Sequence, residues 1–498
     1  MIKGFNVTKV AAAISFSALF ICQFTQAAPW VDTSDIYLRA DIQALADGGV
    51  ISAPINTYPL MWAGIGKDLA KAEPSLFSAD LVDAYSRVNF YYQNAVNNRG
   101  NTVIKASAAS DPARFQHFGS DYREKGQIQA SQEYMDERLA YKIKASAVYD
   151  PLDDKEFRFE DSYVALILGN WVTTFGAVAQ WWGPGFDSAL HKSTNARPMS
   201  SLMISRHNPQ AFETPWLSWL GQWTLNGGVS LSEQERYIPN VLLWSLRAGF
   251  KPLKTLEVGL SWTAQFCGEG QDCGVNSASE SIINPQDCQM GVSDNGECVA
   301  NANQMTGFDA RYADTWFSVP VGLYLERTCE NASGESWAMA DCGQMVGVDT
   351  RFNFLKQQYK LFLEYSDTTV NCGKEGQYNC FYEHSIYQSG SRYYGRALGS
   401  TYDSDAKVTA LGLVGQFENS HGFTSILRYA QLNNDGKNVT SQWSPQPLKE
   451  DLIMLELSYR LPMFNGMLTL GGSVSNANYE VQDDDSQASV FSAYEYRF

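Results

Sequence analysis

The sequence predicts a transmembrane β-barrel of about 18 antiparallel strands, preceded by a small α-helical unit. Three observations carry this prediction. The chain opens with an export signal, apolar residues recur at every second position over most of its length, and aromatic residues alternate up to the final Phe498. Strands that cross a bilayer run about 10 residues and alternate apolar side chains toward lipid with polar ones toward the lumen.

Residues 1–27 have the pattern of a secretory signal peptide. Lys3 and Lys9 precede an apolar stretch from Val10 to Ile21, and small residues occupy Thr25 and Ala27. We expect cleavage after Ala27, because a signal peptidase reads small side chains at these two positions. The mature protein is therefore predicted to be exported.

The composition excludes several classes of protein. The chain has 37 basic and 54 acidic residues and a formal charge of −17, so it lacks the basic footprint that nucleic acid requires. Hydrophobic residues make up 44% of the chain, but the mean hydropathy is only −0.27. No segment after the signal has the long apolar run of a membrane-spanning helix. An aromatic content of 13% fits the girdles of a barrel instead.

Residues 28–98 are predicted to form two or three helices on the periplasmic side. Ser34 or Asp35 can cap a helix that Gly48 and Gly49 would end. Between them, apolar residues recur at three- and four-residue spacing, and a second such series begins after Ser78.

From residue 99 to residue 498 the apolar period is two, as in the run from Leu256 to Phe266. Short connections alternate with long polar ones, so we expect short turns in the periplasm and long loops outside the cell. The 18 predicted strands lie near 101–109, 126–135, 138–149, 157–169, 171–180, 198–206, 222–232, 241–250, 256–266, 304–311, 316–326, 345–352, 359–366, 408–417, 423–432, 452–461, 468–479 and 488–498.

The cysteines are predicted to form disulfides, because an even number follows the signal of an exported chain. In this arrangement of strands, every cysteine lies in an outer loop and each loop holds an even number. We expect Cys329–Cys342 and Cys372–Cys380, whereas Cys267, Cys273, Cys288 and Cys298 share one loop and allow three connectivities. No CxxC pair or histidine spacing suggests zinc, so no metal and no cofactor is expected.

The C-terminal strand ends Tyr494-Glu495-Tyr496-Arg497-Phe498. Terminal strands of outer-membrane barrels look like this, because the barrel-assembly machinery recognises such an end. The sequence therefore predicts the outer membrane of a Gram-negative bacterium, with lipid and lipopolysaccharide around the barrel and the long loops at the cell surface.

The densest group of aromatic and turn residues lies between residues 181 and 198. It can be a wall on which sugar rings stack, or a loop folded into the lumen and packed there, and we favour packing because aromatic side chains mostly supply contact area. The residues of this motif are Trp181, Trp182, Gly183, Pro184, Gly185, Asn195, Arg197 and Pro198.

Three stretches resemble the capsule-assembly Wzi family of outer-membrane proteins in order and spacing. They are residues 38–51, Gly183–Gly185 with Asn195–Pro198, and residues 210–221. The resemblance implies an 18-stranded barrel with a periplasmic helical bundle that acts as a plug. It also implies a surface lectin that attaches capsular polysaccharide or a related exopolysaccharide. The likeness is weakest in the cysteine-rich outer loops, so the identity of the sugar does not carry over.

Candidate contacts with the polymer come from residue chemistry in the predicted outer loop 381–402. Tyrosine rings offer stacking faces, and arginines bind sugar carboxylates through two parallel hydrogen bonds. The alternative is that this segment is an ordinary solvated loop, with tyrosines of the aromatic girdle at its base. The candidates are Tyr382, His384, Tyr387, Arg392, Tyr393, Tyr394 and Arg396, with Trp443 in another outer loop.

The function predicted from the sequence is non-enzymatic binding of polysaccharide at the cell surface. Many weak contacts on the outer loops would gain strength through avidity along a polymer. The alternative is a channel for oligosaccharides or other solutes, because an 18-stranded barrel leaves an aqueous lumen unless something fills it. A barrel enzyme is a distant third, because no GxSxG or HExxH motif names a nucleophile or metal site.

Overall fold

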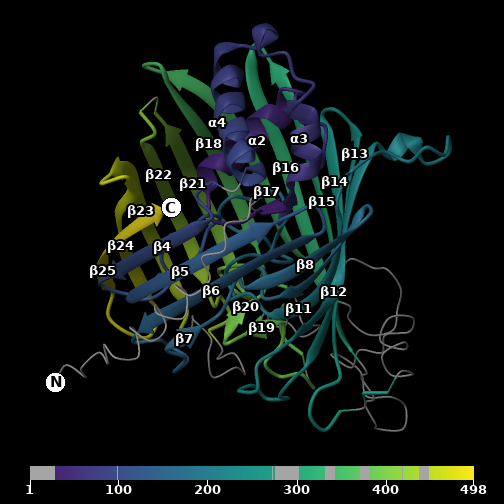
Figure 1. Cartoon of the computed structure of the whole chain (residues 1–498). Helices are drawn as coiled ribbons and strands as arrows, with labels where there is room; N and C mark the ends of the chain where they lie inside the picture. Colours follow the sequence, from purple (N-terminus) through teal and green to yellow (C-terminus); the bar gives the residue numbers. More distant parts are fainter. Residues whose placement is uncertain are drawn as a thin grey trace.

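A computed structural model describes residues 28–97, 99–271, 273–274, 302–330, 342–370, 381–384, 386–417, 419–436 and 448–498. It shows a closed antiparallel barrel in which the last strand pairs with the first, Phe491 opposite Ala109 and Arg497 opposite Val103 (Figure 1). The strands of the barrel are β4 (Thr102–Ala109), β5 (Gly126–Met135), β6 (Leu139–Tyr149), β8 (Tyr163–Leu168), β9 (Trp171–Gly176), β11 (Ser200–Arg206), β12 (Gln222–Leu231), β13 (Leu242–Leu253), β14 (Leu256–Phe266), β15 (Asn303–Trp316), β16 (Val319–Glu330), β17 (Cys342–Phe354), β18 (Gln357–Asp367), β21 (Ala406–Gln416), β22 (Gly422–Leu432), β23 (Glu450–Met463), β24 (Gly466–Tyr479) and β25 (Asp485–Arg497), with the short β7 (Phe157–Arg158) beside β6.

These strands confirm the predicted fold class and the count of 18. The boundaries differ where turns are tighter than expected. Residues 317–318, 355–356 and 464–465 are two-residue turns in which both residues have positive φ, so the flanking strands extend further than predicted. The predicted strand 157–169 is divided into β7 and β8. We call the barrel end that carries these tight turns the turn end, and the opposite end the loop end.

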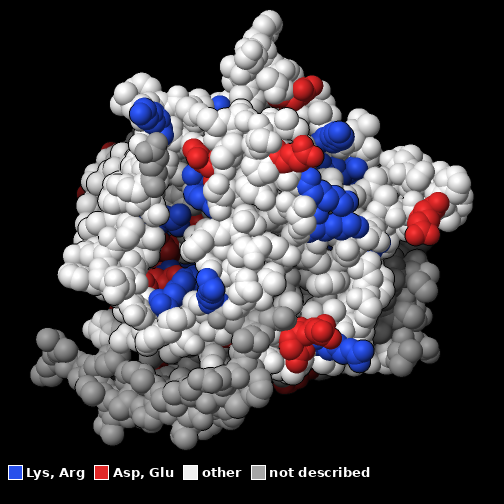
Figure 2. Space-filling view, turned by 45° about the horizontal axis from the view of Figure 1, so that its top comes forward, with Lys and Arg blue, Asp and Glu red and all other residues white. Residues whose placement is uncertain are grey.

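The outside of the barrel is apolar and the inside polar. Along β16, Leu323 and Leu325 are exposed, whereas Tyr324 and Glu326 between them are buried. The face in Figure 2 shows few charged side chains on the outer wall. An exposed apolar exterior of this kind suits lipid, so the barrel spans a membrane. No helix in the described ranges is both long and apolar enough to cross a bilayer.

Two disulfides link the described cysteines. The predicted Cys329–Cys342 bond is present, but these cysteines are opposite each other on β16 and β17 and not in the loop beyond them. Cys267 pairs with Cys273, which resolves part of the connectivity that the sequence left open. Cys288, Cys298, Cys372 and Cys380 lie outside the described residues.

Three α-helices form a unit at the turn end: α2 (Ile36–Asp47), α3 (Trp62–Leu69) and α4 (Ala79–Val96) (Figure 1). Asp35 caps α2 by accepting hydrogen bonds from the backbone N–H groups of Tyr37 and Leu38, as the sequence predicts. Smaller elements complete the unit, namely β1 (Trp30–Val31) paired with β3 (Leu60–Met61), β2 (Thr57–Tyr58) and the 3-10 helix η1 (Pro74–Leu76). Ten of the 12 residues of α2 are buried, because the barrel wall encloses this helix.

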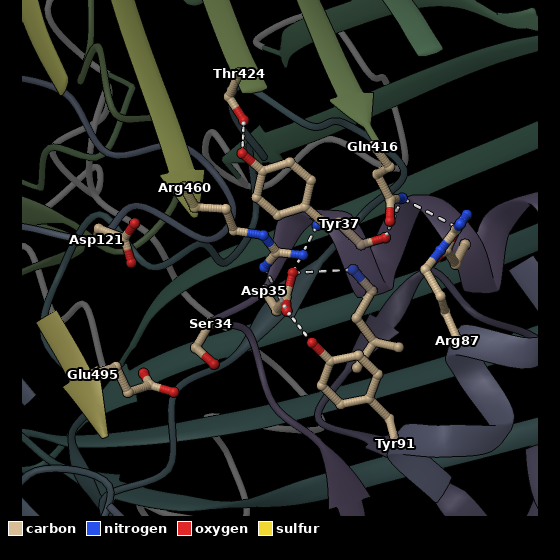
Figure 3. A network of polar contacts seen from close by, with 12 residues as sticks. Ser34, Asp35, Tyr37, Arg87, Tyr91, Asp121, Gln416, Thr424, Arg460 and Glu495 are labelled. Carbon is tan, nitrogen blue, oxygen red and sulfur yellow. Dashed lines mark hydrogen bonds and ion pairs between the residues drawn. The ribbon is translucent and has the colours of Figure 1, made fainter. Parts of the chain in front are cut away.

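A polar network fastens this helical unit to the turn end of the wall (Figure 3). Arg460 on β23 pairs with Asp35 at 3.1 Å, and its guanidinium lies 3.6 Å from the Tyr37 ring centroid. The Thr424 hydroxyl donates to the Tyr37 hydroxyl at 3.0 Å. The Tyr91 hydroxyl on α4 donates to Asp35, so one carboxylate joins two helices and a strand.

This network predicts a pH-dependent difference between the wild type and Asp35→Asn. Burial acts to raise the pKa of Asp35, but Arg460 and the hydrogen bonds outweigh it, so its pKa lies below the ordinary value. The ion pair therefore contributes above the pKa of the unfolded chain, about 4, and is lost as pH falls through the folded pKa. We expect Asp35→Asn to cost roughly 1–3 kcal/mol near neutral pH. The gap in Tm between the two proteins should close as pH is lowered from about 6 to about 3. A gap that stays constant over this range would contradict the assignment.

Candidate functional site

Three segments from the loop end fold into the lumen and interlock there. They are residues 110–125, 177–199 and the described part of 381–405, and we call them together the lumenal cap. The second contains β10 (Trp181–Trp182), which pairs with β2 of the helical unit, Trp181 opposite Tyr58. The third contains the hairpin β19 (Arg392–Tyr393) and β20 (Arg396–Ala397). The cap thus meets the helical unit inside the barrel.

The structure buries the aromatic-turn motif completely at its core. Trp181 and Trp182 are 0% and 1% exposed. Arg39 of α2 lies between the rings of Phe118 and Phe186, 4.3 and 4.2 Å from their centroids, and donates to the Pro184 carbonyl. These residues hold the cap against the helical unit and leave no open aromatic wall at this point.

Gly183 is required at its position. Its φ of +138° is rarely adopted by other residues, and a Cβ there would lie 2.6 Å from the Glu326 carboxylate. The close approach of this backbone to the wall explains the glycine of the motif.

Carboxylates on the inner wall hold the cap and the helical unit by accepting backbone N–H groups. Glu364 accepts from Phe186 and Asp187 at 2.6 and 3.0 Å, and Glu326 accepts from Leu190 and His191 at 2.8 and 3.0 Å. Glu257 accepts hydrogen bonds from the backbone N–H groups of Ile55 and Asn56 in the helical unit. Glu330 accepts one from the backbone N–H of Tyr382. Sequence reasoning missed this set, although acidic residues at inward positions of membrane strands were a usable signal.

Arg428 on β22 holds the lumenal cap through ion pairs. Its side chain is 0% exposed, and its nitrogens lie 2.9 Å from Asp187 of the cap and 2.7 Å from Glu456 of β23. The Tyr402 hydroxyl also donates to Asp187, which ties residues 177–199 to residues 381–405.

The predicted glycan contacts of residues 381–402 lie mostly inside the cap. Tyr382, Tyr387 and Arg392 are 0%, 2% and 1% exposed, and His384 is also buried, so these side chains offer no free face. Tyr382 donates to the Leu190 carbonyl and accepts from the Ser400 backbone, and Arg392 pairs with Asp403 and Glu383. These residues of the predicted outer loop lie inside the barrel, where inward-facing polar groups of distant segments satisfy them.

The remaining candidates keep partial exposure. Tyr393, Tyr394 and Arg396 are half-buried. Arg197 of the motif lies 3.9 Å from the Tyr394 ring centroid, which brings two predicted sets of residues together. Arg396 donates to the Ala113 carbonyl and faces Asn195. Trp443 lies outside the described residues.

A polar cavity of about 280 Å³ runs between the cap, the helical unit and the inner face of β4, β5 and β6. Its wall includes Asp32 and Arg497 toward the turn end and Arg158 and Arg197 toward the loop end. In Figure 2 a hollow beside the helical unit holds acidic and basic side chains below its rim. No group of three His, Cys, Asp or Glu residues in the described ranges is placed to hold a metal ion.

The fold and its contents define a membrane-spanning β-barrel whose lumen is occupied by its own loops and by an N-terminal helical unit. The chain belongs to the capsule assembly protein Wzi family, whose model matches residues 95–490. The resemblance predicted from the sequence is thereby confirmed.

Two similar proteins are informative. An uncharacterized 55.8 kDa protein in the cps region of Klebsiella pneumoniae is 26% identical over 486 residues, which are 96% of this chain and 92% of that protein. The solved structure of Wzi from Escherichia coli is described as a carbohydrate-binding β-barrel of the outer membrane, involved in group 1 capsule assembly. It matches with a TM-score of 0.80 at 23% identity and covers 94% of this chain and 99% of that one. At this identity the match shows a shared fold.

Proposed function

We propose that this protein is a non-enzymatic outer-membrane protein that binds capsular polysaccharide or exopolysaccharide and attaches it to the cell surface. The observation that carries the proposal is membership of the capsule-assembly family together with a lumen filled by the protein's own segments. A filled lumen favours binding over transport, because solute flux through a barrel needs an open aqueous passage.

The attachment surface is the loop end of the barrel around Tyr393, Tyr394 and Arg197. Tyrosine rings pack on the apolar faces of sugars. Arg197 lies over the Tyr394 ring and pairs with Glu160 at 2.9 Å and with Asp153, so it positions the ring and offers no free charge. Each contact is weak, but a polymer meets many copies of the protein, so avidity strengthens the attachment.

The remaining partners follow from the exterior of the barrel. Exposed apolar side chains along the wall face lipid, and lipopolysaccharide would surround the loop end. Phe498 is 62% exposed and packs edge-on against Tyr496, and this exposure supports the proposed recognition by the barrel-assembly machinery.

Capsule retention tests the function. In a deletion strain we expect polysaccharide to be released into the medium at unchanged total yield, and the wild-type gene to restore retention. Unchanged retention of polysaccharide in the deletion strain would contradict the proposal.

Point variants locate the contact. Because most of the 381–402 segment is structural, Tyr393→Ala with Tyr394→Ala is a better test than removal of the segment. We expect this double variant to release several times more polymer than the wild type, because the stacking contacts between tyrosine rings and sugars are lost. Phe317→Ala, which removes a fully exposed aromatic ring at the opposite end of the barrel, is the matched control and should retain the polymer. Equal retention by the two variants would exclude this surface.

A further inference from the structure

The lumenal cavity concentrates positive charge in an acidic protein. Basic side chains outnumber acidic ones by eight to six among the residues that line it, whereas the whole chain has 37 basic and 54 acidic residues. A cavity with this balance attracts anions, although the protein as a whole repels them.

Two of these cations have no carboxylate within salt-bridge distance among the described residues. Lys192 is 7% exposed, and its ammonium donates to Gln180 at 2.9 Å and Ser245 at 2.7 Å, above the ring of Trp182. Arg123 donates to two backbone carbonyls, those of Thr194 and Asn195. Both cations line the cavity, Lys192 from residues 177–199 of the cap and Arg123 from residues 110–125, but they contact different groups.

An unpaired buried cation is costly, because neutral oxygens replace only part of its hydration. Burial lowers the pKa of Lys192 to about 7, which reflects this cost. An anion bound beside either cation would offset this cost. Other cations of the cavity are already paired, such as Lys144 with Asp161 at 2.8 Å and Lys105 with Asp121 at 2.8 Å.

The rest of the lining suits a saccharide more than a bare inorganic ion. Gln127, Gln129 and Ser131 line the cavity from β5, and Gln180 and Ser193 line it from the cap. Amides and hydroxyls both donate and accept hydrogen bonds, as sugar hydroxyls do. The volume is near the lower end of small-molecule pockets, about 300–1,000 Å³, so a short saccharide fits better than a long chain.

We infer that this cavity is a binding site for an acidic saccharide unit, with Lys192 or Arg123 holding its carboxylate and the amides of β5 and the cap holding its hydroxyls. The inference rests on the proposed function and adds an internal site and a charge class for the sugar.

The test uses the purified full-length protein in detergent micelles and digalacturonate as the probe, followed by isothermal titration calorimetry. Its methyl ester is the matched probe, because it has the same sugars without the charge. We expect saturable binding of the acid and at least about tenfold weaker binding of the ester. Lys192→Met or Arg123→Gln, whichever removes the cation that holds the carboxylate, should weaken binding of the acid by a similar factor. Lys449→Met is the control variant, because Lys449 pairs with Glu480 on the exposed surface and does not line the cavity.

The outcomes separate this inference from the proposed function. Absent binding, equal affinity for acid and ester, or full affinity in both cavity variants would overturn the internal site. Displacement of digalacturonate by an equal concentration of inorganic phosphate would show a general anion site and would overturn the saccharide assignment. The comparison of acid with ester needs only the wild-type protein, so it stands even if a variant misfolds. Capsule retention in cells is measured independently, so a failed titration with intact retention removes the cavity site and leaves the attachment function in place.

Discussion

Arg428→Leu is expected to destabilise the lumenal cap more than any exposed substitution. The change leaves the carboxylates of Asp187 and Glu456 buried without the cation that lies between them. Breaking a buried ion pair by removing one partner costs about 3–5 kcal/mol, because the remaining charge stays desolvated. We expect a lower unfolding midpoint in urea and faster protease cleavage within residues 177–199 of the folded protein in micelles.

Two further variants make this result specific. Lys449→Leu removes an exposed ion pair with Glu480 and should leave the midpoint unchanged, because surface pairs contribute little. Adding Asp187→Asn and Glu456→Gln to Arg428→Leu should recover part of the loss, since the two buried carboxylate charges are then removed. An Arg428→Leu protein as stable as the Lys449→Leu control would show that the ion pairs of Arg428 are not needed to hold the lumenal cap.

The barrel itself was predictable because its signal is local. Alternation along Leu256–Phe266 or Leu323–Glu326 needs only the contrast between lipid outside and polar groups inside. The strand ends were less predictable, because the turns at Phe317-Ser318 and Leu355-Lys356 adopt positive φ without the glycine or asparagine that usually marks such turns.

The contents of the lumen were not predictable in the same way. Whether Tyr382 faces a sugar or the Leu190 carbonyl depends on segments almost 200 residues apart in the chain. The sequence alone does not distinguish a tyrosine that stacks on a sugar from one that packs inside the protein. Glycan contacts were therefore predicted for Tyr382, Tyr387 and Arg392, which the structure buries. Inward glutamates such as Glu326 and Glu364 indicated that something polar fills the barrel, but not which segment.

Removal of residues 28–97 is expected to raise the ion conductance of the barrel several-fold. An 18-stranded barrel is wide enough for an aqueous lumen, and the helical unit occupies its turn end. The exposed wall would carry ion pairs such as Arg247 with Asp309 and Arg311 with Asp349, which water solvates readily. The opened end should therefore fill with water and ions.

The measurement is single-channel conductance in planar bilayers, with heat-modifiable gel migration as the check that each barrel is folded. Asp35→Ala with Asp41→Ala keeps the unit but removes its contacts with Arg460 and Gln416 of the wall (Figure 3), so it should show brief openings between closed periods. If the shortened barrel folds but conducts no better than the wild type, the helical unit is not the barrier. The lumenal cap, held by Glu326, Glu364 and Arg428, would then close the lumen by itself, and the same recording on Arg428→Leu would show whether loosening it opens the barrel.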